Sequence, residues 1–185
     1  MPLKANSLTE KQLIVGCKRR LAKYQKEVFD RYAGKMLSVC KRYARHHMEA
    51  EDMMQDGFVK VFRYIDTFGD KGSFEGWIRR IMINTSLKHC SKSSFKKESI
   101  GIETMPDNSV NPDVFSKIGT DELLELIQTL PDGYRIVFNL YAIEGFSHKE
   151  IAETLGVGES TSRSQLVKAR RILQKKVEEL AKIAV

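Results

Sequence analysis

The stretch FSHKEIAETLGVGESTSRSQLVKARRIL, residues 146–173, decides the fold of the second half of this chain. Ser147 and Glu150 have the S-x-x-E spacing of a capping box, in which each side chain satisfies a free backbone amide at a helix start. The glycines at 156 and 158 then predict a turn of about three residues, and a second helix is expected from about Glu159. A capped short helix, a glycine turn and a basic second helix are typical of a helix-turn-helix.

The second helix of this motif is the candidate DNA reader. Its inward positions are predicted to be Leu166, Ala169 and Leu173. The candidate contact residues lie early in the helix and away from that face: Glu159, Thr161, Arg163, Ser164 and Lys168. Side chains of these types can reach base edges or phosphates in a major groove. The alternative is a helical hairpin that contacts another protein.

Apolar residues also recur at helical spacing elsewhere, without a convincing strand or repeat. The first half predicts three helices. One carries an apolar stripe from Leu21 to Tyr43, the next runs from Ala50 to Ile65, and the third contains Phe74, Trp77, Ile78 and Ile81. Residues 91–119 have the polar, proline-containing composition of a linker. We therefore expect an all-α chain whose two small helical domains, residues 1–90 and 120–185, are joined by a flexible linker.

The charges are distributed unevenly along the 185 residues, which carry a net +7. Residues 1–97 have 21 basic and 10 acidic side chains, residues 98–158 have 3 and 11, and residues 159–176 have 6 and 1. Two basic segments thus flank an acidic one. A surplus of this kind indicates an anionic partner such as nucleic acid.

Several classes of protein are not indicated by the sequence. Cys17, Cys40 and Cys90 are an odd count without CxxC spacing, and no ligand spacing joins them to His46 and His47, so neither a disulfide framework nor a metal site is expected. No nucleophile-base pattern or phosphate loop indicates an enzyme or a cofactor. The chain shows no signal peptide and no apolar run near the ~20 residues of a membrane span. We expect a cytoplasmic protein that does not insert into membranes.

The predicted helix that follows residue 73 combines an aromatic side chain with polar ones. Arg80, Asn84 and Lys88 recur every four residues, and Trp77 lies one turn before Arg80. Aromatic rings beside cationic and amide groups suit an unpaired nucleic-acid strand, which needs stacking for its bases and charge for its phosphates. Trp77 also has core spacing with Phe74, so a structural role for it stays open.

A small acidic-polar patch interrupts the basic first half. Asp52, Gln55 and Asp56 occupy one face of the second predicted helix. Nucleic acid would be repelled there, so the patch suits either solvent or a basic protein surface.

Three runs, in this order and spacing, resemble the extracytoplasmic-function sigma factors of bacterial RNA polymerase, members of the sigma-70 superfamily. They are AEDMMQDGFVKVF (50–62), FGDKGSFEGWIRRIMIN (68–84) and LPDGYRIVFNLYAIEGFSHKEIAETLGVGESTSRSQLVKARRIL (130–173). The resemblance covers nearly the whole chain apart from the first residues and the linker. It implies an alternative sigma factor without enzymatic activity that binds core RNA polymerase and directs promoter recognition, promoter melting and transcription initiation.

The resemblance also assigns roles to residues. Asp52, Gln55 and Asp56 become the polymerase-binding patch. The loop from Phe68 to Ser73 matches the segment that pockets a flipped base of the minus-ten element. The minus-ten residues implied are Phe68, Lys71, Ser73, Trp77, Arg80, Asn84 and Lys88. The helix-turn-helix would read the minus-thirty-five element, the linker would thread through the polymerase, and an anti-sigma factor is an expected partner.

Some positions depart from the usual pattern of that family. Lys88 stands where many members have an acidic residue, and Ser91 where many have arginine. Ser160 and Ser162 replace a frequent glycine and aliphatic residue, and Ser162 at an inward position suggests a close helix approach or a weaker core. Two other functions fit parts of the pattern. A helix-turn-helix repressor or activator would leave the acidic patch without a role, and an adaptor or sigma-sequestering protein would use the same helices for protein contacts.

Overall fold

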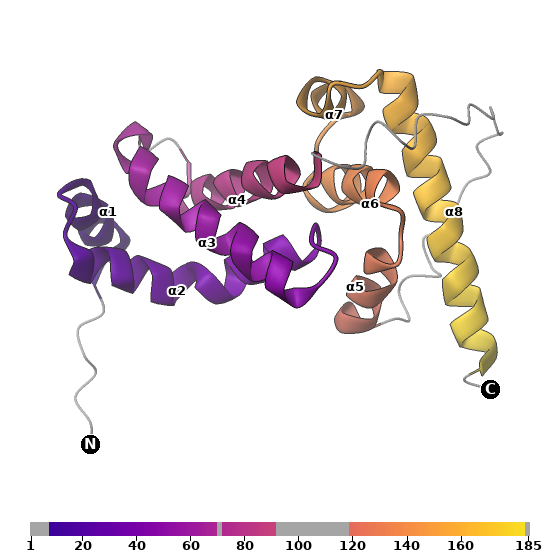
Figure 1. Ribbon diagram of the computed structural model, residues 1–185, viewed down its shortest axis with the longest axis horizontal. Helices are drawn as coiled ribbons and strands as arrows, with labels where there is room; N and C mark the ends of the chain where they lie inside the picture. The colour runs from indigo at the N-terminus through magenta and orange to yellow at the C-terminus, as the bar shows by residue number, and fades with distance from the viewer. Residues whose placement is uncertain (1–7, 70–71, 92–118, 184–185) are drawn as a thin grey trace. The chain divides into compact units, whose positions relative to one another are not determined.

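The computed structural model describes residues 8–69, 72–91 and 119–183, and helices are the only regular elements among them. The predicted all-α fold is thereby confirmed. The chain separates into two compact units, Met1–Ser86 and Leu87–Val185, so the first unit ends within a helix (Figure 1). No helix in the described ranges has the length and hydropathy that a membrane crossing requires. The predicted linker falls almost wholly outside the described residues.

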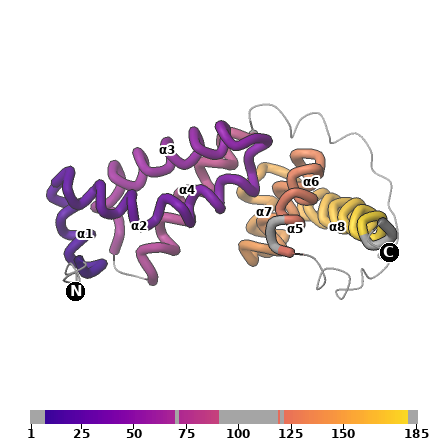
Figure 2. Tube along the Cα trace, turned by 90° about the horizontal axis from the view of Figure 1, so that it is seen from below, coloured from indigo at the N-terminus to yellow at the C-terminus, as the bar shows by residue number. Residues whose placement is uncertain are grey.

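The described residues of the first unit form four α-helices, one more than the three that we expected. They are α1 (Glu10–Lys18), α2 (Ala22–Lys41), α3 (His47–Tyr64) and α4 (Phe74–Ser91), with a short 3-10 turn, η1 (Ile65–Thr67), after α3. Figures 1 and 2 both show α2, α3 and α4 side by side, with α1 against the first turns of α2. The helix that the sequence analysis missed is α1.

A local signal and an unusual residue together delimit α1. Thr9 and Gln12 form a capping box at its start. At its end, the amide of Arg20 donates to Cys17 O (2.9 Å) and that of Leu21 to Gly16 O (3.1 Å), the pattern of a Schellman motif. Arg20 has the left-handed φ of 60° that glycine usually supplies there. The prediction that Leu21 belongs to a buried stripe is therefore wrong: it precedes α2 and is 45% exposed.

The core of the first unit comes from the apolar faces of α2, α3 and α4, as the periodicity predicted, and α1 adds Leu13, Ile14 and Cys17. Tyr32 of α2 meets Phe74 of α4 edge-on, with 5.8 Å between ring centroids. The buried positions include Val28, Tyr32, Met36, Cys40, Ala50, Met53, Phe58, Val61, Phe74, Ile78 and Met82. His46 caps α3 by accepting from the amide of Glu49 at 3.2 Å.

All three cysteines are free and buried. Burial raises the pKa of the Cys17 and Cys40 thiols to about 11, against partial opposition from nearby arginines and, for Cys40, a hydrogen bond with Ser86. Thiols with such pKa values stay protonated at neutral pH and react slowly. The two cysteines therefore act as small core residues.

The second unit is a helical array around the long last helix. Its elements are α5 (Thr120–Gln128), α6 (Asp132–Phe138), the π-helical turn η3 (Asn139–Ile143), α7 (His148–Leu155) and α8 (Glu159–Ile183). Ile127 and Leu130 pack with Ala169 and Leu173 of α8 in a buried cluster. Arg135 is buried as well, and its guanidinium donates to Asp132 Oδ1 at 2.8 Å and to Gln128 O at 3.3 Å. These contacts involve α5, α6 and the later turns of α8. The helix-turn-helix consists of α7 and the first turns of α8.

Candidate functional site

The acidic-polar patch lies on the exposed face of α3. Asp52, Gln55 and Asp56 are all exposed, while Met53 and Phe58 of the same helix are buried. The spacing of three and four residues puts the three polar side chains on one stripe. The predicted solvent-facing placement is therefore present in the structure.

Two exposed apolar side chains that were not predicted as site residues extend this stripe at its ends. Met48 is 72% exposed and Val59 is 62% exposed. Met48 precedes Asp52 by four residues and Val59 follows Gln55 by four, so they share the face of the patch. The available signal was that spacing, because neither residue fits the buried stripe of α3. We refer to Met48, Asp52, Gln55, Asp56 and Val59 as the α3 stripe.

A second stripe, with the opposite charge, runs along the surface of α4. Arg80, Asn84 and Lys88 are exposed, and Trp77 is half-buried one turn earlier. The four residues, which we call the α4 stripe, recur at three- and four-residue spacing on one face of the helix. The predicted polar stripe is therefore on the surface, where a strand could reach it.

Aromatic rings form the base of the α4 stripe. Trp77 stacks on Phe74 with 5.8 Å between centroids and 13° between planes, and it meets Phe68 at 5.5 Å and 54°. Phe68 is only 4% exposed, so its ring belongs to the core and cannot stack on a base without rearrangement. Trp77 packs on Phe74, as its core spacing predicted, and is half-buried rather than fully enclosed.

The loop before α4 is held at both of its ends. Ser73 caps α4, its Oγ accepting from the amide of Gly76 at 3.0 Å. Lys18, which the sequence analysis did not single out, donates from Nζ to the carbonyl of Phe68 at 3.1 Å. Lys71 lies outside the described residues. The corner between α1 and α2 therefore helps to position the loop.

Arg20 makes a second connection from the same corner. Its guanidinium donates to the carbonyl of Phe62 near the end of α3 and pairs with Asp66 Oδ2 at 2.6 Å. Both side chains of the ion pair are at least half exposed, so the pair itself stabilises the fold by ~1 kcal/mol or less. The contacts of Arg20 and Lys18 instead help to set the position of the segment that leads into the loop, because they join it to the end of α1.

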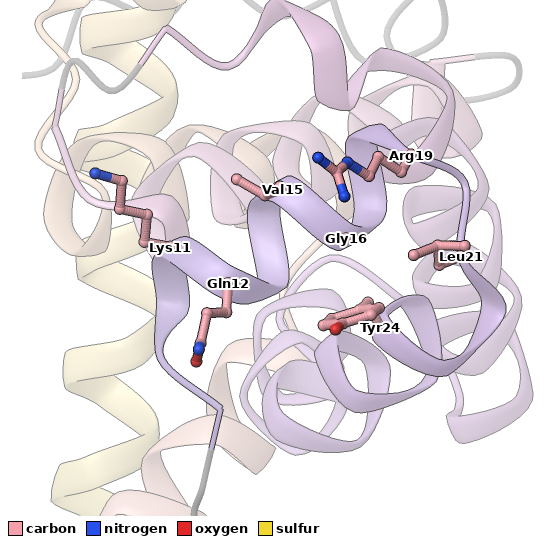
Figure 3. A pocket seen from close by; sticks show the side chains of 7 residues that line it. All are labelled: Lys11, Gln12, Val15, Gly16, Arg19, Leu21 and Tyr24. Atoms are coloured by element: carbon pink, nitrogen blue, oxygen red, sulfur yellow. The ribbon is translucent and has the colours of Figure 1, made fainter.

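An open pocket of about 320 Å³ lies on the outer side of this corner (Figure 3). Figure 3 shows the Tyr24 ring facing Gly16, with Lys11 and Arg19 projecting at either end of α1. The lining residues are Lys11, Gln12, Val15, Gly16, Arg19, Leu21 and Tyr24. This lining contains no carboxylate, cysteine or histidine. Among the described residues there is also no cluster of three or more potential metal ligands.

The helix-turn-helix has the local geometry that its sequence predicts. Ser147 Oγ accepts from the amide of Glu150 at 3.3 Å, and the Glu150 carboxylate accepts from the amide of Ser147 at 2.8 Å. Gly156 ends α7 with a φ of 68°, a conformation that strains residues with a side chain. The next helix begins at Glu159, as predicted.

The five candidate reading residues of α8 lie away from its buried face, in different surroundings. Glu159, Arg163 and Ser164 are exposed, whereas Thr161 and Lys168 are half-buried. Arg163 pairs with Glu159 at 3.1 Å, so part of its charge is balanced in the free protein. Exposed pairs of this type are weak, so the arginine can exchange this partner for another anionic group.

Comparisons with known proteins identify the family of this chain. Residues 28–95 match the family described as Sigma-70 region 2, and residues 120–173 match Sigma-70, region 4. The ECF RNA polymerase sigma factor SigE of Mycolicibacterium smegmatis is 30% identical over 154 residues, 80% of this chain and 59% of that protein. The ECF RNA polymerase sigma-E factor of Haemophilus influenzae is 25% identical over 194 residues, 95% of this chain and 99% of that protein.

A solved structure shows the same fold. The sigma factor RpoE, determined in complex with the anti-sigma factor NepR from Bartonella quintana, gives a TM-score of 0.50 at 19% identity, covering 83% of this chain and 96% of that one. This chain belongs to the sigma-70 family, within which it is an extracytoplasmic-function sigma factor, an alternative sigma factor that directs transcription initiation. A simple helix-turn-helix regulator describes the chain less well, because it would leave the match to region 2 unexplained.

Proposed function

We propose that this sigma factor binds core RNA polymerase through the α3 stripe, holds the unpaired minus-ten strand on the α4 stripe and reads the minus-thirty-five duplex with α8. The observation that carries this division is the presence of two exposed stripes of opposite character on neighbouring helices of one unit. A polyanion is repelled by carboxylates and attracted by arginine and lysine, so the two stripes suit different partners.

The composition of the α3 stripe suits a protein partner. Exposed Met48 and Val59 flank the exposed carboxylate of Asp52. Apolar anchors bury surface on association, while carboxylates select a basic partner and its register. We assign the stripe to a basic surface of core polymerase.

The α4 stripe suits a flexible strand rather than a protein. Arg80 and Lys88 offer charge, Asn84 offers hydrogen bonds to bases, and Trp77 lies at the edge of an aromatic group. A single strand can adapt its backbone to such a row, with phosphates and base edges meeting successive turns. The loop held by Lys18 and capped by Ser73 is where we place the flipped base, with Lys71 as a further contact and Phe68 supporting the loop from the core.

For the second unit we propose duplex recognition by the exposed face of α8. Arg163 can form a bidentate contact with guanine, Glu159 can accept from cytosine, and Ser164, Thr161 and Lys168 can contact bases or phosphates. Ser164 Oγ donates to the carbonyl of Thr161 at 3.0 Å in the free protein and would exchange that bond on binding. The capping box and glycine turn support this proposal because they orient the start of α8.

The same proposal includes the domain boundaries of the chain, its location in the cell and the partner that regulates it. We assign residues 1–90 to region 2, 91–119 to the linker and 120–185 to region 4, in a cytoplasmic protein without catalytic activity of its own. An anti-sigma factor is expected to sequester it, as the Bartonella quintana sigma factor is bound by NepR.

The test is run-off transcription with purified core polymerase and a promoter library. The wild-type chain should produce specific transcripts that depend on the core enzyme. Failure on every promoter, with binding to duplex DNA alone, would instead support a repressor or activator.

Charge reversal then tests the α3 stripe. Asp52→Arg with Asp56→Arg should weaken core binding by about a hundredfold or more, because like charges then face each other. Glu27→Arg with Asp30→Arg makes the same change in charge on α2 and should leave core affinity nearly unchanged. Circular dichroism checks that both variants keep their helices. If both double variants bound core polymerase with equal affinity, the α3 stripe would be a solvent-exposed surface without a role in polymerase binding.

A further inference from the structure

A partly buried polar contact joins the two helices of the helix-turn-helix. Ser162 of α8 is fully buried, and its Oγ lies 2.8 Å from Nδ1 of His148, the first residue of α7. Fourteen residues separate the two in sequence. The serine that replaces an aliphatic residue is therefore not simply a gap in the core, because its hydroxyl has a specific partner across the motif.

The histidine ring is fixed on its other side as well. It stacks on Tyr141 of η3, with 4.4 Å between centroids and 22° between planes. The guanidinium of Arg170, farther along α8, lies over the same tyrosine ring at 5.8 Å from its centroid. The imidazole of His148 thus connects η3, α7 and α8. Arg170 adds a second contact between α8 and Tyr141 of η3.

We propose that His148 is a positioning residue for promoter recognition, which sets the rotation of α8 through its contact with Ser162. The inference rests on the proposed duplex-reading function of α8. Ser162 is followed directly by Arg163 and Ser164, so a rotation of the helix about its axis moves both reading side chains. Apolar packing tolerates small rotations, whereas a hydrogen bond weakens steeply when its angle changes.

The charges around the ring favour its neutral form. Burial is the main reason that the pKa of His148 is lowered from 6.5, and Arg163 and Arg170 of α8 act in the same direction, opposed by Glu159. From η3 the ring faces Tyr141, and from α8 it faces the Ser162 hydroxyl. A neutral ring can accept from the Ser162 hydroxyl through Nδ1, whereas a protonated ring can only donate, so protonation changes the bond that holds the ring against α8. It also adds a positive charge near Arg163 and Arg170, which repel it.

The sign of the pH effect follows from the lowered pKa. The stabilisation associated with the neutral ring is complete above 6.5 and is lost as pH falls below 6.5 through the folded-state pKa. Sequence-selective binding should weaken over that acidic range. Non-selective DNA binding should not, because added positive charge favours contact with phosphates.

The experiment uses the full-length chain and two fluorescent duplexes, one selected from a random library by the wild-type protein and one with the same bases scrambled. The measured quantity is the ratio of the two affinities. His148→Ala and Ser162→Ala should each lower this ratio by about threefold to tenfold, the range of one hydrogen bond. The double variant should lose no more than either single one, because both changes remove the same contact. His148→Gln, whose amide can still bond Ser162, should recover part of the loss.

A pH series separates positioning from simple packing. Between about pH 7.5 and pH 5.5 the wild-type ratio should fall more than that of His148→Gln, since only the former titrates at this position. The other three histidines are present in both proteins, so the difference reports His148.

Thermal unfolding controls for loss of fold, and Ser162→Ala, a small truncation, keeps the test valid if His148→Ala unfolds. Additive losses in the double variant, or unchanged ratios in folded variants, would overturn the inference. A wild-type chain that shows no preference for any duplex would overturn the proposed reading function instead.

Discussion

The two helices that we assign to DNA, α4 and α8, are held in different ways. The α4 stripe stands on an aromatic group, and its loop is fixed at the backbone by Ser73 and Lys18. The start of α8 is fixed by side chains, through the contact of Ser162 with His148. The difference matches their proposed ligands. A single strand can adapt to a row of exposed groups, whereas a rigid duplex requires the reading helix itself to be oriented.

The largest effect should follow from removing the central α4 contacts. Arg80→Ala with Asn84→Ala takes away a charged and an amide contact that exist only after the strands separate, so promoter opening should fall by roughly a hundredfold. Permanganate reactivity of thymines near the start site measures opening. Closed-complex binding should persist, and a pre-melted template should partly rescue the variant. Normal opening would contradict the assignment of α4.

The complementary change in α8 should impair a different step. Arg163→Ala with Lys168→Ala should weaken upstream duplex binding by about 1 to 3 kcal/mol for any side chain that makes a bidentate base contact. Opening should survive on a strong or pre-melted template. Equilibrium binding to the upstream duplex measures the loss, and full affinity in this variant would remove α8 from the reading role.

The importance of the α1–α2 corner for the first unit can be tested at Gly16. An added Cβ would lie 2.1 Å from Cγ of the Tyr24 ring, so Gly16→Ala should lower the free energy of unfolding by about 1 to 3 kcal/mol. Gly34→Ala in α2 is the matched control, because nothing lies within 4 Å of its added Cβ. Urea denaturation measures both. The Gly16 variant should also open promoters poorly yet bind upstream duplex normally, and an equal loss of the two activities would contradict a separate role for the corner.

The smallest effect is expected at the turn of the second unit. Gly156 has a φ of 68° with open space around it, so Gly156→Ala should cost about 1 kcal/mol from backbone strain alone. Gly119→Ala, at a position with equal space and a φ of −64°, is the control. Thermal unfolding should show a loss for the first variant only. No loss at Gly156 would mean that the turn relaxes easily and contributes little to the orientation of α8.

Local chemistry explains which parts of the fold were predictable. The capping box of Ser147 and Glu150, the glycine turn and the start of α8 involve groups within a few residues of one another, and all were predicted correctly. The helix α1 had a local start signal in Thr9 and Gln12 that was not recognised in the sequence, and its end depends on Arg20 in a conformation that usually indicates glycine. The contacts of Arg20 with Phe62 and Asp66, more than forty residues away, accompany that conformation.

The candidate sites divide in the same way. Periodicity placed Asp52, Gln55, Asp56, Arg80, Asn84 and Lys88 on exposed faces, because spacing along a helix determines which side chains share a face. The resemblance, rather than the pattern, supplied the roles of the loop residues. Phe68 shows the limit of both, since its ring is in the core.

The sequence by itself determined the helical class, the helix-turn-helix and the separation of the acidic-polar patch from the basic segments, since these depend on composition and on spacings of three or four residues. Only the tertiary structure decided that Met48 and Val59 complete the α3 stripe, that Lys18 holds the loop and that Ser162 meets His148. The physical reason is that a contact between residues distant in sequence depends on how whole helices pack, and no local spacing records that geometry.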